Sequence, residues 1–216
     1  MRIGLHDADK NKFPNLALMK ISAWHKRRGD DVVWWNPMER CDEVYSSKVF
    51  TFTPQEPMLP ENTIKGGTGY GLPYTDLPDE IDAMFPDYSI YPDVDYAVGF
   101  LTRGCIRKCP WCVVPKKEGQ IRPYRSWHDV KRVDSRDIVF MDNNVLASDY
   151  GIAEMEDMIG EDVRAVKDRL VELGYLHKST HNLMGYDSRK AVKAFQKANG
   201  LEVDGIVGPL TWKALF

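Results

Sequence analysis

Strand-like and helix-like patterns alternate along the first part of this 216-residue chain. Residues 1–5 and 31–36 are short apolar runs, and residues 15–28 between them have apolar positions at helical spacing. Residues 48–53 predict a third strand that follows a short helix. The expected apolar face of the first helix comprises Leu16, Met19, Ala23 and Trp24. Because strands that alternate with helices pair in parallel, the pattern predicts a Rossmann-like α/β sheet with helices on its faces.

The middle of the chain continues this pattern after an irregular stretch. Residues 54–95 are crowded with Pro and Gly, which favours loops. Residues 95–101 and 137–141 then predict buried strands, and residues 127–132 predict a short helix. The second of these strands is followed by Asp142, Asn143 and Asn144. Polar side chains at the carboxyl end of a parallel strand occupy the usual ligand position of α/β folds.

A change of pattern near residue 160 indicates a separate helical domain. One helix is expected at residues 150–159, and another begins at residue 162, where apolar side chains recur at spacings of three and four. Asp187 is suited to cap a further helix, and Pro209 to open the last one. The expected domains are residues 1–95, 96–159 and 160–216, the last an all-α three-helix module.

Three of the four cysteines lie close together, as Cys105, Cys109 and Cys112 in a C-x3-C-x2-C arrangement. Cys41 is distant, so an ordinary disulfide framework is disfavoured. Thiolates that converge from one loop suit a soft metal or an iron–sulfur cluster, and three ligands on a 4Fe-4S cluster leave one iron open to an external chelating group. Two alternatives remain: a zinc ion with a histidine such as His128 as fourth ligand, or three reduced thiols.

This cysteine loop resembles that of the radical S-adenosylmethionine (radical SAM) superfamily, with Trp111 at the aromatic position before the last cysteine. The resemblance implies that Cys105, Cys109 and Cys112 hold a 4Fe-4S cluster whose open iron binds S-adenosylmethionine. It also implies that Trp111 packs near this cofactor. The polar residues that would contact the methionine part of the cofactor are Asp142, Asn143 and Asn144.

The sequence around the cysteines, at residues 99–105 and 112–119, is similar to a bacterial and phage subgroup of that superfamily with a B12-binding-like N-terminal domain. Residues 1–95 would form that domain. Its cobalamin loop has the pattern Asp-x-His-x-x-Gly, whereas residues 7–12 contain no histidine. Cobalamin is therefore not an expected cofactor.

A complete barrel of this type needs more strands than the chain provides. An eight-unit barrel takes about 250 residues, whereas only residues 96–159 lie between the expected sheet domain and the helical module. The sequence thus predicts a partial TIM-like barrel that lacks most of a substrate pocket. Either two chains complete each other as a homo-oligomer or the segment is a scaffold, and catalysis by one chain alone is not expected.

The last block resembles the three-helix peptidoglycan-binding module of lysins, amidases and spore cortex enzymes. The matching stretches are residues 163–175, 191–201 and 203–212, and one departure is that residues 181–185 stand where a second Asp-Gly turn is usual. The resemblance implies that peptidoglycan is the partner. The aromatic residues expected to stack on its sugars are Tyr175, Tyr186 and Trp212.

The charge balance limits the choice of partner. There are 29 basic and 32 acidic residues, so the chain lacks the cationic excess typical of nucleic-acid binders. No apolar run is long enough to span a membrane, and the first 20 residues contain no signal-peptide pattern, so synthesis in the cytoplasm is expected. Two hypotheses follow: a cell-wall-binding protein, phage-derived and reaching the wall through holins, or a radical SAM enzyme that a partner chain completes.

Overall fold

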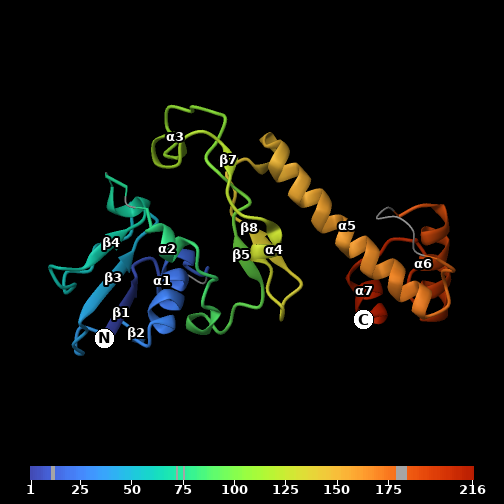
Figure 1. The fold of residues 1–216 in the computed structure, drawn as a ribbon, viewed down its shortest axis with the longest axis horizontal. Helices are drawn as coiled ribbons and strands as arrows, with labels where there is room; N and C mark the ends of the chain where they lie inside the picture. The colour runs from blue at the N-terminus through green and yellow to red at the C-terminus, as the bar shows by residue number, and fades with distance from the viewer. Residues whose placement is uncertain (11–12, 72, 75, 179–183) are drawn as a thin grey trace. The chain divides into compact units, whose positions relative to one another are not determined.

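The computed structural model describes residues 1–10, 13–71, 73–74, 76–178 and 184–216. The chain forms two compact units, residues 1–148 and 149–216 (Figure 1). The first unit includes both of the N-terminal segments expected from the sequence, up to residue 148. Residues 149–159, which the sequence analysis assigned to the middle segment, belong to the second unit.

A four-stranded parallel sheet organises the first unit and confirms the expected α/β class (Figure 1). Its strands lie in the order β2-β1-β3-β4, and β1 pairs in parallel with both β2 and β3. The strand bounds are β1 Arg2–Asp7, β2 Asp31–Trp34, β3 Glu43–Ser47 and β4 Ile64–Gly66.

The strand expected at residues 48–53 is wrong, because these residues form no regular secondary structure and β3 precedes them. The aromatic side chains that favoured the prediction are exposed: Phe50 and Phe52 stack on each other, with ring centroids 5.1 Å apart. The strand at this position in the sheet is instead β3, in which the smaller side chains of Val44 and Ser46 are buried. The short helix expected before this strand is also absent from residues 35–42.

Residues 35–42 connect the parallel strands β2 and β3 without a helix, although parallel crossovers are usually longer and helical. They pass close to Gly4 in β1. A Cβ atom at Gly4 would lie 3.0 Å from Cys41 Sγ and 3.2 Å from Trp35 Cδ1. A side chain at this position would therefore require Cys41 and Trp35 to shift by a few tenths of an ångström.

Helix α1, Leu16–Arg27, packs on the sheet through Leu18 and Ile21, which contact Ile3 and Leu5. Asn15 caps its first turn, and the chain leaves the helix at Gly29, whose φ is +83°. The buried set differs from the expected face: it comprises Leu18, Met19, Lys20, Ile21, Ser22 and His25. The reason is that α2 and η2 contact the helix in addition to the sheet. Their bounds are α2 Asp79–Asp82 and η2 Tyr88–Ile90.

The rest of the first unit has two small sheets in place of the expected barrel segment. β5, Ala97–Gly99, pairs in parallel with β8, Ile138–Phe140, and β6 pairs antiparallel with β7. β5 and β8 lie within the ranges expected from the sequence, but among the described residues no third parallel strand joins them, so a TIM-like barrel is not shown. The remaining bounds are η1 Thr68–Tyr70, β6 Thr102–Arg103, α3 Val114–Lys117, β7 Arg122–Pro123, α4 Trp127–Val130 and η3 Val145–Ala147.

The second unit is helical, as expected, and contains α5 Asp149–Glu172, α6 Tyr186–Ala198 and α7 Pro209–Leu215. The two helices expected at residues 150–159 and from residue 162 are one helix, because α5 runs without interruption through a buried Gly160. The predicted cap is also displaced: Gly185 precedes α6, and Asp187 lies in its first turn. None of the described helices is both long enough and apolar enough to cross a membrane.

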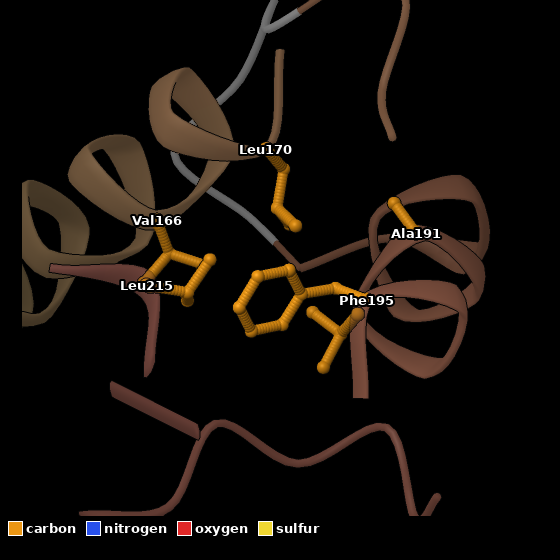
Figure 2. Packing of buried hydrophobic residues seen from close by; sticks show 6 residues of the cluster. Val166, Leu170, Ala191, Phe195 and Leu215 are labelled. Carbon is orange, nitrogen blue, oxygen red and sulfur yellow. The ribbon is translucent and has the colours of Figure 1, made fainter. Parts of the chain in front are cut away.

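The second unit has a single apolar cluster at the junction of its helices (Figure 2). Phe195 from α6 lies between Val166 and Leu170 of α5 and Leu215 of α7 (Figure 2). The Nε atom of Arg169 donates a hydrogen bond to the carbonyl oxygen of Leu215 at 2.8 Å, which ties the end of α7 to α5. The complete buried cluster is Val166, Leu170, Ala191, Val192, Phe195 and Leu215.

Candidate functional site

The cysteine loop runs from β6 to β7 and is held at its base by Glu118. The Glu118 carboxylate accepts a hydrogen bond from the N–H of Gly104 at 2.9 Å and lies 3.5 Å from the Arg103 guanidinium. The N–H of Cys105 also donates to the carbonyl of Gly119 at 3.2 Å. The two ends of the loop are thus tied together before the cysteines begin.

The polar residues after β8 contact the cysteine loop and the turn after β5. Asp142 accepts hydrogen bonds from the N–H of Leu101, at 3.0 Å, and from the hydroxyl of Thr102, at 2.6 Å. Asn143 donates to Glu118 at 3.0 Å, and the Asn144 amide lies 3.8 Å from Cys105 Sγ. The structure therefore brings these three residues to the loop, as the sequence predicts, but engages them in bonds within the protein.

The thiol groups are free and half-buried at Cys105, Cys109 and Cys112, and also at Cys41. Within the described part of the chain, no group of three or more His, Cys, Asp and Glu side chains is gathered in a way that could hold a metal ion. The three thiolates suit a soft metal chemically, but their arrangement does not form a ligand set. His128, the alternative zinc ligand, instead stacks on Trp127 with ring centroids 4.0 Å apart.

Trp111 is 87% exposed. It lies within a tight turn in which the N–H of Cys112 donates to the carbonyl of Cys109 at 3.0 Å. The side chain is thus in contact with solvent at the tip of the loop. Its expected role beside a cofactor stays a prediction.

In the second unit, Gln196 organises the connection between α6 and α7. Its side chain is only 1% exposed and donates hydrogen bonds to Asp204 at 2.8 Å and to the carbonyl of Ile206 at 3.0 Å. The side-chain oxygen Oε1 of Gln196 accepts a hydrogen bond from the N–H of Gly205 at 2.9 Å. A buried amide with both of its polar atoms bonded fixes this loop to the helix.

Asp204 completes the same turn. Its carboxylate accepts from the N–H of Ile206 at 2.8 Å, and this bond together with the one from Gln196 lowers the pKa of Asp204 below its ordinary value. Gly205 has a φ of +77° and lies against Lys193 of α6. The Asp-Gly pair that the sequence marks as a turn therefore sits directly on α6.

Exposed apolar side chains lie in this loop, at the start of α7 and at the start of α6. Ile206 is 66% exposed and Leu210 is 74% exposed. Tyr186, 82% exposed, precedes Arg189 and Lys193 on α6 by three and seven positions, and therefore shares their helix face. We call Tyr186, Ile206 and Leu210 the loop surface.

The other two aromatic candidates pack on the core. Tyr175 meets Phe195 edge-on, with ring centroids 5.5 Å apart. Trp212 is half-buried against the apolar cluster, and its ring is tilted over Phe216 at 4.9 Å. Of the three residues expected to stack on sugar, Tyr186 is the most exposed.

Comparison with known proteins concerns this same unit. Residues 159–215 match the family described as "Putative peptidoglycan binding domain". An uncharacterized protein in the bpoA1 3' region of Kitasatospora aureofaciens is 39% identical over 61 residues, which are 28% of this chain and 52% of that protein. The alignment thus spans about half of the relative's length. No solved structure was found to match the chain.

The family match confirms that the last block is similar to a peptidoglycan-binding module. It extends from the second half of α5 to the end of α7 and includes the whole loop that Gln196 holds. The role of Gln196 was not predicted from the sequence. The available signal was a polar residue next to Phe195 on a helix face that also carries Ala191 and Val192. Of the departure noted at residues 181–185, positions 181–183 lie outside the described residues.

Proposed function

We propose that the chain binds peptidoglycan through residues 149–216. The observation that carries the proposal is the match of residues 159–215 to a peptidoglycan-binding family. The fold of this unit supports the proposal. Other residues form its apolar core and hold its loop, so the side chains of the loop surface remain exposed. Exposed apolar side chains in a group are typical of a contact surface.

The chemistry of the loop surface suits a glycan. Sugar rings present C–H groups on their faces and hydroxyl groups at their edges. Tyr186 offers an aromatic face with a hydroxyl at its end, and Ile206 and Leu210 offer further exposed apolar groups in the same unit. We infer that Tyr186 is the principal stacking residue, and that Tyr175 and Trp212 contribute from their half-buried positions.

Helix α6 adds positive charge next to this surface. Its exposed side chains include Arg189, Lys190, Lys193 and Lys197, against a single acidic residue, Asp187. The peptide stems of peptidoglycan carry carboxylates, which these cations would attract. Because exposed charges are screened by salt, this part of the binding energy should fall as the ionic strength rises.

Co-sedimentation of the full chain with purified bacterial sacculi tests the proposal. The parent chain should pellet with the sacculi, and Tyr186→Ala should bind several-fold more weakly. Phe52→Ala is the matched control, since Phe52 is 80% exposed but belongs to the first unit. Tyr175→Ala and Trp212→Ala also remove core contacts, so their circular dichroism must be compared with that of the parent. A parent chain that stays in the supernatant would refute the proposal.

We further propose that the cysteine loop binds a soft metal centre, an iron–sulfur cluster in the first instance. The hydrogen bond between Glu118 and the N–H of Gly104 supports this. It joins the two ends of the loop, while Cys105, Cys109 and Cys112 remain free thiols. Closure of the loop around the metal would have to gather these thiols.

Anaerobic reconstitution with iron and sulfide tests this second proposal. Iron content should be lost in Cys105→Ala and retained in Cys41→Ala, because Cys41 lies beside Gly4 and away from the loop sequence. Equal iron content in Cys105→Ala and in the parent would refute it.

A further inference from the structure

A cavity of about 310 Å³ opens in the first unit at the carboxyl ends of β1 and β2. Strand β1 supplies Leu5, His6 and Asp7, and Trp34 and Trp35 come from the end of β2. β1 has β2 on one side and β3 on the other. Open parallel sheets bind ligands outside the carboxyl ends of their strands, which is the edge at which this cavity lies.

Aromatic rings form the walls of this cavity. Trp34 is 44% exposed and meets Tyr91 edge-on, with ring centroids 5.4 Å apart. Trp35 meets His6 in the same way at 5.5 Å. Aromatic faces of this kind are suited to stacking on a planar ring.

Polar groups lie between these walls and are held in place by other residues. The His6 Nδ1 atom is 2.8 Å from Ser46 Oγ, which is 2.6 Å from the Tyr70 hydroxyl. The other ring nitrogen, Nε2, makes no hydrogen bond with any residue that the structure describes. Asp7 accepts a hydrogen bond from the Tyr91 hydroxyl at 2.8 Å. Asp7 is thus an oriented carboxylate on the same side of the cavity as Trp34 and Tyr91, and His6 is held on the other face of β1 beside Trp35.

A positive charge completes the cavity at Lys10, which is exposed and has a left-handed φ of 44°. The loop that carries it is fixed by its neighbour Asp9, whose carboxylate accepts from the N–H of Val49 at 2.6 Å. The N–H of Ala8 also donates to the Ser47 carbonyl at 2.9 Å. Lys10 is therefore presented by a loop that is tied to the end of β3.

We propose that this cavity binds a purine mononucleotide, with the base stacked on Trp34, its polar edge at Asp7, and its phosphate at Lys10. The volume is at the low end of the roughly 300–1,000 Å³ of small-molecule sites, which fits one base and one phosphate better than a dinucleotide. The site lies wholly within the first unit and is independent of the wall-binding proposal.

Calorimetric titration of the full chain with AMP and with adenosine tests the proposal. AMP should bind, and adenosine should bind several-fold more weakly because it lacks the group that Lys10 attracts. Trp34→Ala should weaken AMP binding by roughly tenfold or more, the usual scale of a lost base–aromatic stack. Trp111→Ala is the matched control and should leave the affinity unchanged, since Trp111 is exposed on the cysteine loop.

Lys10→Ala provides a second variant that does not threaten the fold, because Lys10 is exposed. It should reduce the affinity for AMP to that for adenosine, whereas Lys108→Ala should not. The absence of AMP binding at millimolar concentration would overturn the proposal, as would an unchanged affinity in Trp34→Ala. Binding of N-acetylglucosamine that depends on Trp34, in place of AMP, would also overturn it and assign the cavity to a sugar.

Discussion

Both units bury polar side chains beside an apolar cluster, but in the second unit the buried Gln196 joins neighbouring parts of the chain, whereas the first unit buries an ion pair between distant segments. Lys20 is only 6% exposed and bonds to Asp82 at 2.8 Å and to the Tyr124 hydroxyl at 3.1 Å. These three residues come from α1, α2 and the segment after β7. The comparison shows that the helical unit is specified by local hydrophobic spacing, while the α/β unit also depends on ion pairs between distant segments.

The largest effect is expected in the apolar cluster. Phe195→Ala removes the ring at the centre of the second unit and should cost about 3–5 kcal/mol of its unfolding free energy, because truncating a buried Phe leaves a cavity. Differential scanning calorimetry of the full chain should show one transition shifted to lower temperature and the other unchanged. Phe52→Ala, at an exposed position, is the control. A shift of both transitions would contradict the independence of the two units.

A smaller effect is expected when the buried ion pair of the first unit is broken. Lys20→Met keeps the length of the side chain but leaves Asp82 without its main cation. The cost should be about 2–3 kcal/mol, less than the roughly 3–5 kcal/mol of a fully buried pair, because Tyr124 and Arg125 still contact Asp82. Urea unfolding compared with Lys108→Met measures it. Equal stability of the two variants would show that the pair contributes nothing.

The pH dependence of stability in acid should also differ between the two units, and this effect should be smaller still. Burial alone would raise the pKa of Asp87, but hydrogen bonds from Lys26, Ser22 and Ser89 outweigh it and lower the pKa from 3.8 to about 2. The bound carboxylate therefore stabilises the first unit fully above about pH 4, and this contribution, about 2 kcal/mol, is lost as the pH falls toward 2.

Asp87→Asn should remove this part of the acid dependence, as measured by unfolding between pH 2 and pH 5. The second unit has the exposed Asp204, whose pKa is lowered chiefly by the N–H of Ile206, so a weaker dependence is expected there. An unchanged acid dependence in Asp87→Asn would contradict the assignment.

The same contrast explains how far the sequence predicted the structure. Local patterns were sufficient for β1, α1, α6 and α7, because apolar spacing and end signals such as Pro209 lie within each element. They failed at residues 48–53, where β-favouring aromatic residues are exposed and a less apolar segment pairs as β3. They also failed at residues 149–172, where two separate helices were expected and the structure has the single helix α5.

The candidate sites show the same limit. Spacing alone identified the cysteine loop and the Asp-Gly turn, because the residues involved are neighbours in the chain. The hydrogen bond between Glu118 and Asn143 joins residues 25 positions apart, and the contact of Asn144 with Cys105 joins residues 39 positions apart, so no local pattern predicts them. The cavity at His6 likewise depends on Tyr91 and Ser46, which no local pattern joins to β1.

The central claim, that the second unit binds peptidoglycan by itself, is tested most directly by comparing two fragments. Residues 149–216 and residues 1–148 should be produced separately and mixed with purified sacculi at the same concentration. The account predicts that the first fragment sediments with the sacculi as completely as the full chain does, while the second stays in the supernatant. Binding by residues 1–148 in the absence of binding by residues 149–216 would contradict it.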